Sequence, residues 1–117
     1  MKSFLDTYAI IEIANGNPAY SKFSLHDCCT SIFNLFELTY HIVKSGKKDS
    51  DFFAFKPLLT DISTDWLLEA AKFRTEYSSR NFSYADAIGY VASIKIGCVF
   101  VTGDQQFKDM PNVEFIK

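Results

Sequence analysis

Residues 83–107 read SYADAIGYVASIKIGCVFVTGDQQF, and this stretch predicts a helix, a strand and a turn in succession. Ser83 is suited to capping the start of a helix, and Gly97 is suited to ending one. Between them, apolar and small residues recur at helical spacing and predict a buried helix face, made of Tyr84, Ala85, Ile88, Val91, Ala92 and Ile96. Residues 98–101 are apolar and mostly β-favouring, which predicts a strand buried on both faces.

Two acids take defined positions in this unit. Asp86 falls in the first turn of the helix, and Asp104 lies in the turn that follows the strand. Ligand sites in open α/β sheets lie at the carboxyl ends of the strands. This part of the chain therefore predicts two carboxylates near one edge of a sheet.

The rest of the chain alternates short strands with helices. Helices are predicted over residues 7–15, 31–45 and 64–79, with single helical turns over 52–55 and 105–110. Strands are predicted over residues 4–6, 26–30, 58–62 and 113–116. This alternation favours an α/β fold, a three-layer α/β/α sandwich with a central, mainly parallel sheet.

Length and composition favour a single globular domain over residues 1–117. Hydrophobic residues make up 48% of the chain and charged residues 22%, which excludes a disordered protein. Trp66 and the phenylalanines are expected in the core or at a dimer face, ahead of any role in base stacking. No apolar run approaches the ~20 residues of a membrane span, and Met1-Lys2 leads directly into a predicted strand, so we expect no signal peptide and a cytoplasmic location.

Charge and cysteine content argue against duplex-DNA binding, a disulfide framework and a zinc site. The formal net charge is -2, which is not the basic footprint of a protein that binds duplex DNA. Cys28, Cys29 and Cys98 form neither a disulfide framework nor a zinc-binding spacing. We expect them to be reduced thiols in the core.

Four acids occupy positions that an α/β fold can bring together: Asp6, Glu37, Asp86 and Asp104. Each also has a purely structural interpretation. Asp6 and Asp104 are placed to cap the helical segments that follow them, and Ser83 with Asp86 forms a capping-box pattern. Glu37 lies among apolar neighbours in mid-helix, where a solvated face is the alternative.

Considered together, the four acids favour a metal site. Carboxylates within ~4–6 Å of one another repel unless a cation neutralises them. Oxygen ligands without a matching set of His or Cys favour Mg²⁺ or Mn²⁺. Ions of this kind suit the hydrolysis of phosphodiester bonds.

The same residues carry a resemblance to a known family. The chain resembles a PIN domain, in particular the small single-domain ribonuclease toxins of the VapC type, found in type II toxin–antitoxin systems. The resemblance covers nearly the whole chain and rests on four ordered motifs: Phe4–Thr7, Asn34–Leu38, Tyr84–Ile88, and Val101–Asp104 followed by Phe107.

The resemblance implies a metal-dependent endoribonuclease. It implies that Asp6, Glu37, Asp86 and Asp104 are the catalytic carboxylates that hold Mg²⁺ or Mn²⁺, and that Thr102 is a supporting hydroxyl. The implied partners are an RNA substrate, a second copy of the chain in a homodimer, and a small antitoxin that blocks the acidic cleft. No membrane partner is expected.

Two alternatives compete with this hypothesis. One is a non-catalytic PIN-like module that binds RNA or a protein. The other is a phosphohydrolase of the haloacid-dehalogenase type, because Gly103-Asp104 with Asp109 is similar to the last motif of that family. That family needs an acid two residues after its first Asp, where this chain has Tyr8. Tyr8 and Gly89 are also departures from the PIN pattern.

Overall fold

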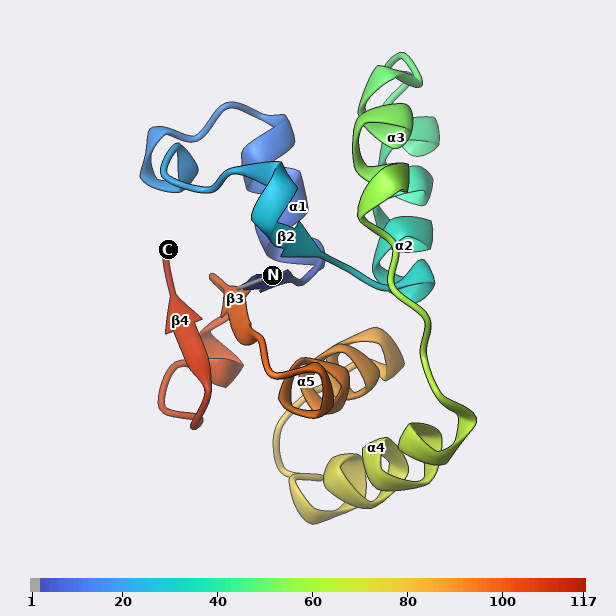
Figure 1. Cartoon of the computed structure of the whole chain (residues 1–117), viewed down its shortest axis with the longest axis vertical. Helices are drawn as coiled ribbons and strands as arrows, with labels where there is room; N and C mark the ends of the chain where they lie inside the picture. Colours follow the sequence, from blue (N-terminus) through green and yellow to red (C-terminus); the bar gives the residue numbers. More distant parts are fainter. Residues whose placement is uncertain (1–2) are drawn as a thin grey trace.

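A computed structural model describes residues 3–117, which form a four-stranded parallel sheet flanked by five α-helices (Figure 1). The strands are β1 (Ser3–Leu5), β2 (Cys28–Cys29), β3 (Val99–Thr102) and β4 (Val113–Phe115), in the order β2-β1-β3-β4. The α-helices are α1 (Thr7–Ala14), α2 (Ile32–Lys44), α3 (Ser50–Phe55), α4 (Thr64–Glu76) and α5 (Tyr84–Ile96). Four short 3₁₀ helices complete the fold: η1 (Pro18–Tyr20), η2 (Leu25–Asp27), η3 (Lys56–Leu58) and η4 (Gln105–Phe107).

The sheet separates two hydrophobic cores, because successive residues of a strand point to opposite faces. Leu5 and Val101 pack with the buried residues of α1 and α2, whereas Phe4 and Phe100 pack with those of α5. Helix α4 lies against α5 on the outer side of the second core (Figure 1). The predicted three-layer α/β/α sandwich is confirmed.

The second core is built mainly from aromatic rings. Phe82 stacks on Phe107 with ring centroids 4.5 Å apart, and Phe107 lies 4.8 Å from Phe100. Tyr90 of α5 joins them and donates its hydroxyl hydrogen bond to the carbonyl of Pro111 at 2.6 Å. The expectation that the aromatic residues fill the core is confirmed for this cluster.

The predicted helix ends agree with the structure because the sequence carries the capping chemistry. The Ser31 and Ser83 side chains accept hydrogen bonds from the backbone N–H groups of Asn34 and Asp86 and begin α2 and α5. Gly97 ends α5 in the left-handed conformation, with φ of 85°. That conformation strains residues with a Cβ atom, so glycine is favoured there.

The predicted strands at 26–30 and 58–62 are largely wrong. Only Cys28–Cys29 pairs as a strand in the first segment, where Leu25–Asp27 forms a 3₁₀ turn. The second segment makes one isolated bridge, between Leu59 and Thr30. Because β2 is only two residues long, it offers too few backbone N–H and C=O groups for a full strand over residues 58–62 to pair with it.

Three further predictions need correction. Strand β3 begins at Val99, which is 39% exposed, so burial on both faces starts only at Phe100. Tyr84 is 72% exposed, because it is the first residue of α5 and lies beyond the buried part of the helix. The predicted turn at 52–55 is a longer helix, α3. The expectation drawn from Met1 and Lys2 lies outside the described residues.

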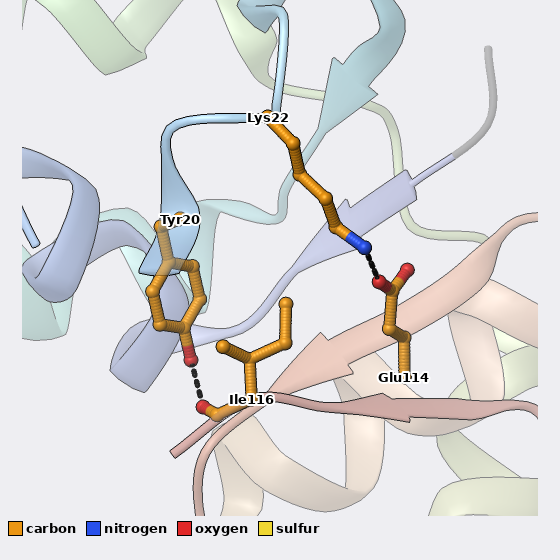
Figure 2. A network of polar contacts seen from close by, with 4 residues as sticks. All are labelled: Tyr20, Lys22, Glu114 and Ile116. Atoms are coloured by element: carbon orange, nitrogen blue, oxygen red, sulfur yellow. Dashed lines mark hydrogen bonds and ion pairs between the residues drawn. The ribbon is translucent and has the colours of Figure 1, made fainter. Parts of the chain in front are cut away.

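The edge strand β4 and the residues after it are held to the loop after α1 by two side-chain contacts. Figure 2 shows the hydroxyl of Tyr20 donating a hydrogen bond to the carbonyl of Ile116, and Lys22 paired with Glu114 of β4. These contacts hold the end of β4 beside β3, where Ile116 N–H donates to the Thr102 carbonyl at 2.8 Å. The last strand thereby supports the turn that carries Asp104.

The three cysteines are buried, as predicted. Among the helices of residues 3–117, none is both long and apolar enough to cross a membrane.

Candidate active site

Asp6 lies at the carboxyl end of β1 and is almost completely buried, with 1% of its surface exposed. Its carboxylate accepts a hydrogen bond from the Ala9 N–H at 2.8 Å and so caps α1. The buried hydroxyl of Thr102, at the end of β3, also hydrogen-bonds to this carboxylate. The predicted supporting hydroxyl therefore does lie beside a predicted site acid.

Burial raises the pKa of Asp6 to about 7. The hydrogen bonds from Thr102 and Ala9 act in the opposite direction because they stabilise the charged form. The negative charges of Asp86 and Asp104 raise the pKa further. Three acids that are distant in the sequence thus share one electrostatic environment.

Asp86 lies in the first turn of α5 and forms a complete capping box with Ser83. The Ser83 N–H donates to the Asp86 carboxylate at 2.8 Å, and the Asp86 N–H donates to the Ser83 hydroxyl at 3.0 Å. Burial raises the pKa of Asp86 to about 6, against the hydrogen bonds from Ser83, and the charges of Asp104 and Glu37 add to the increase.

Asp104 is half-buried in the turn after β3, next to the buried Gly103. Its carboxylate accepts a hydrogen bond from the Gln106 N–H at 3.0 Å and begins η4. Its own N–H donates to the Thr102 hydroxyl at 3.0 Å. Thr102 therefore connects Asp6 with Asp104, and capping roles are present for all three aspartates.

Glu37 is half-buried on α2 and is held by a chain of polar side chains. The Thr7 hydroxyl donates a hydrogen bond to the Glu37 carboxylate and accepts one from the Asn34 amide at 3.1 Å. The Ser31 hydroxyl donates to the Asn34 side-chain oxygen at 2.6 Å. This chain fixes the position of Glu37 relative to the start of α1.

The sequence predicts no separate role for Thr7 or Asn34. A signal was present, because Asn34 lies one helical turn before Glu37 and Thr7 directly follows Asp6. The sequence does not reveal the hydrogen bond between Asn34 and Thr7, which joins residues 27 positions apart on two different helices.

The four acids have the chemistry of a site for a hard divalent cation. All are carboxylates, and neither histidine nor cysteine is among the residues whose charges act on Asp6 and Asp86. Within residues 3–117, however, no group of three or more His, Cys, Asp or Glu side chains is arranged to hold a metal ion. The four acids are therefore connected by the charges that act on Asp6 and Asp86, and not by a formed metal-binding geometry.

A family profile described as the PIN domain matches residues 3–113, and the chain therefore belongs to the PIN domain family. This match favours the PIN hypothesis over the haloacid-dehalogenase alternative. A comparison with curated proteins found no match.

Solved structures of toxins share this fold. One is a toxin-antitoxin complex from Klebsiella pneumoniae, with a TM-score of 0.80, 18% identity, and coverage of 97% of this chain and 96% of that chain. Another is VapC20 of Mycobacterium tuberculosis, a toxin that cleaves the sarcin-ricin loop, with a TM-score of 0.76, 15% identity, and coverage of 98% and 97%. A third is VapBC2 from Rickettsia felis bound to a DNA fragment of its promoter, with a TM-score of 0.73, 23% identity, and coverage of 99% and 98%.

Proposed function

We propose that the protein is a metal-dependent endoribonuclease that hydrolyses phosphodiester bonds of RNA. The observation that carries the proposal is the buried carboxylate of Asp6, whose pKa is raised to about 7 by burial and by Asp86 and Asp104. Placing like charges around a buried acid destabilises a fold unless a cation or a proton compensates. A divalent cation is the compensation that PIN family membership suggests.

In this proposal Asp6, Glu37, Asp86 and Asp104 are the catalytic carboxylates that hold Mg²⁺ or Mn²⁺. When bound, such a cation supplies polarisation of a phosphate oxygen and a lowered pKa for an attacking water. The Thr102 hydroxyl positions Asp6. Thr7, itself held by Asn34, positions Glu37.

The proposal extends to the biological partners. The structural neighbours include a toxin-antitoxin complex and a toxin that cleaves the sarcin-ricin loop. We therefore assign this chain the role of the toxin in a toxin–antitoxin pair, with a cognate antitoxin, a homodimeric state and a cytoplasmic location. Light scattering of the purified chain, alone and with its antitoxin, tests the stoichiometry.

The decisive experiment follows cleavage of end-labelled RNA in Mg²⁺, in Mn²⁺ and in EDTA. The variants are Asp6→Asn and Asp104→Asn, because asparagine retains an oxygen that can accept the capping hydrogen bond but loses the charge. Asp109→Asn is the matched control, since Asp109 is an exposed aspartate near the same turn.

The expected result is cleavage by the parent and by Asp109→Asn, abolished by EDTA and by either site variant. The alternative is a non-catalytic PIN-like module that binds RNA or a protein. It is favoured by the observation that all four carboxylates already have hydrogen-bond partners. Cleavage that persists in EDTA, or that is unchanged in Asp104→Asn, contradicts the proposed nuclease.

A further inference from the structure

A hollow of about 410 Å³ opens directly beside the acidic cluster. One wall is formed by α2 and the other by the start of α5, with Ile32, Phe33, Phe36, Glu37, Ser83, Tyr84 and Ala85 as its lining. Glu37 is a proposed catalytic carboxylate, and Ser83 is the capping partner of Asp86. A molecule in the hollow therefore lies next to the proposed site of cleavage.

Three aromatic side chains line this hollow, Phe33, Phe36 and Tyr84, and the last two are largely exposed. Phe36 is 67% exposed and Tyr84 is 72% exposed, and neither belongs to the hydrophobic core clusters. Neighbouring exposed apolar side chains that line a concave surface mark a binding site. Of the two places expected for the phenylalanines, the core or a dimer face, this exposure excludes the core for Phe36.

A positive charge lies on the other side of Tyr84. The Arg74 guanidinium is 4.5 Å from the Tyr84 ring centroid, and its Nε donates a hydrogen bond to the Phe82 carbonyl at 2.9 Å. Arg74 covers one face of the ring, so the 72% exposure of Tyr84 leaves the opposite face open. A second hollow of about 480 Å³ on the α4 side is lined by Arg74, Thr75, Ser78 and Tyr84, among others.

We infer that Phe36 and Tyr84 form a stacking site for one unpaired nucleobase of single-stranded RNA, beside the bond to be cleaved. The inference rests on the proposed nuclease function and identifies a place where the RNA substrate binds. Aromatic rings bind bases of any sequence through their faces. Arg74 adds the positive charge that the phosphate of the next nucleotide requires.

An RNA base fits these observations better than a protein segment does. The exposed Tyr84 ring lies against the Arg74 guanidinium, and this pairing of an aromatic face with a positive charge matches a ligand that alternates planar groups with phosphates. The exposed aromatics outside the hollow, Tyr40 on α2 and Phe53 on α3, lack this setting and provide matched controls.

The test measures binding of a short fluorescein-labelled oligoadenylate in Ca²⁺, which binds oxygen ligands in a looser geometry than Mg²⁺. The variants are Phe36→Ala and Tyr84→Ala, with Tyr84→Phe as the conservative change and Tyr40→Ala and Phe53→Ala as controls. In a second series of oligoadenylates, each molecule carries a single abasic site, and the position of this site differs from one oligonucleotide to the next. Melting temperature confirms that each variant folds.

The expected result is a roughly tenfold loss of affinity in Phe36→Ala and in Tyr84→Ala, with parent-like affinity in Tyr84→Phe and in both controls. An abasic site at one position should weaken binding to the parent but cause no further loss in Tyr84→Ala, because the stacked pair is already broken. A merely structural role for Tyr84 predicts no such coupling.

Other outcomes separate this inference from the proposed function. Unchanged RNA affinity in both alanine variants overturns the stacking site, whatever the cleavage assay shows. Loss of dimerisation in the variants, measured by light scattering, with unchanged RNA affinity assigns the surface to a second copy of the chain and also overturns it. A parent that cuts no RNA but binds it through Tyr84 retains the inference and removes the nuclease.

Discussion

Asp6 is the residue at which folding and the proposed chemistry meet. Its carboxylate caps α1 through Ala9 and is buried between β1 and β3 beside Thr102. The same burial, with Asp86 and Asp104 nearby, raises its pKa from the ordinary aspartate value to about 7. The native state therefore holds a proton more tightly than the unfolded state does.

The stability of the metal-free protein should consequently depend on pH. Between about pH 4 and 7 the native state binds more protons than the unfolded state, so the free energy of unfolding falls as pH rises through this range. Asp86, with its pKa raised to about 6, acts in the same direction. In EDTA we expect a loss of a few kcal/mol between about pH 4 and 8.

Urea unfolding of the parent and of Asp6→Asn across this pH range checks the prediction. The asparagine variant keeps an oxygen for the Ala9 N–H but does not titrate, so its stability should change less with pH. A variant that is as pH-dependent as the parent contradicts the assignment of the effect to Asp6.

Thr7 is predicted to be a positioning residue. Thr7→Val keeps the shape of the side chain but removes the hydrogen bond to Glu37 and leaves Asn34 without its acceptor. Loss of a group that orients a ligand residue commonly reduces activity by about 10–100-fold. We expect kcat to fall by this order with KM nearly unchanged, and Thr7→Ser to retain most of the activity because it keeps the hydroxyl. An equal loss in both variants rules out the hydrogen bond as the cause.

At the scale of elements, the turn between β3 and η4 depends on a residue without a side chain. A Cβ atom at Gly103 would lie 2.2 Å from the Tyr8 ring and 2.5 Å from the carbonyl oxygen of Ile116. Both distances are below van der Waals contact. The ring of Tyr8, a departure from the PIN pattern, therefore occupies the space that a side chain at position 103 would need.

Gly103→Ala should destabilise the protein by at least about 1–3 kcal/mol, the usual cost of overpacking. The double variant Tyr8→Ala/Gly103→Ala should recover only part of this loss, since the backbone carbonyl of Ile116 remains in the way. Thermal unfolding measures both effects. Full recovery in the double variant indicates that Tyr8 alone limits the space and that β4 does not.

At the scale of the whole molecule, four elements each contribute one acid to the same region. Asp6 follows β1, Glu37 lies on α2, Asp86 begins α5, and Asp104 follows β3. The parallel order β2-β1-β3-β4 places β1 beside β3, so that their carboxyl ends carry Asp6 and Asp104 side by side. A cation held there, as we propose, is expected to stabilise the entire fold, because only the folded chain brings the four acids together.

Mn²⁺ should accordingly raise the melting temperature of the parent and of Asp109→Asn but not of Asp6→Asn. At a cation concentration about 100 times Kd, the stabilisation is about 2.7 kcal/mol. The effect should be larger at about pH 8 than at pH 5, because protons compete with the cation for Asp6 and Asp86. Equal stabilisation of parent and Asp6→Asn would mean that the cation binds elsewhere.

Local patterns predicted most of the secondary structure. Helices α1, α2 and α5 were anticipated to within a few residues because their ends carry short-range signals, such as Ser31, Ser83 and Gly97. The sheet edges were harder, since a short apolar segment such as 58–62 becomes a strand only if a neighbour offers a paired edge. In the structure this segment forms a single isolated β-bridge, between Leu59 and Thr30.

The sequence by itself determined the type of fold and the four candidate acids, because strand and helix periodicity and the turn positions are local properties of the chain. Only the tertiary structure decided how deeply each side chain is buried and which distant groups touch it. The raised pKa of Asp6, the link from Asn34 through Thr7 to Glu37, and the exposure of Tyr84 all depend on such contacts. Burial and long-range hydrogen bonds arise from packing between elements, which residue spacing along the chain does not specify.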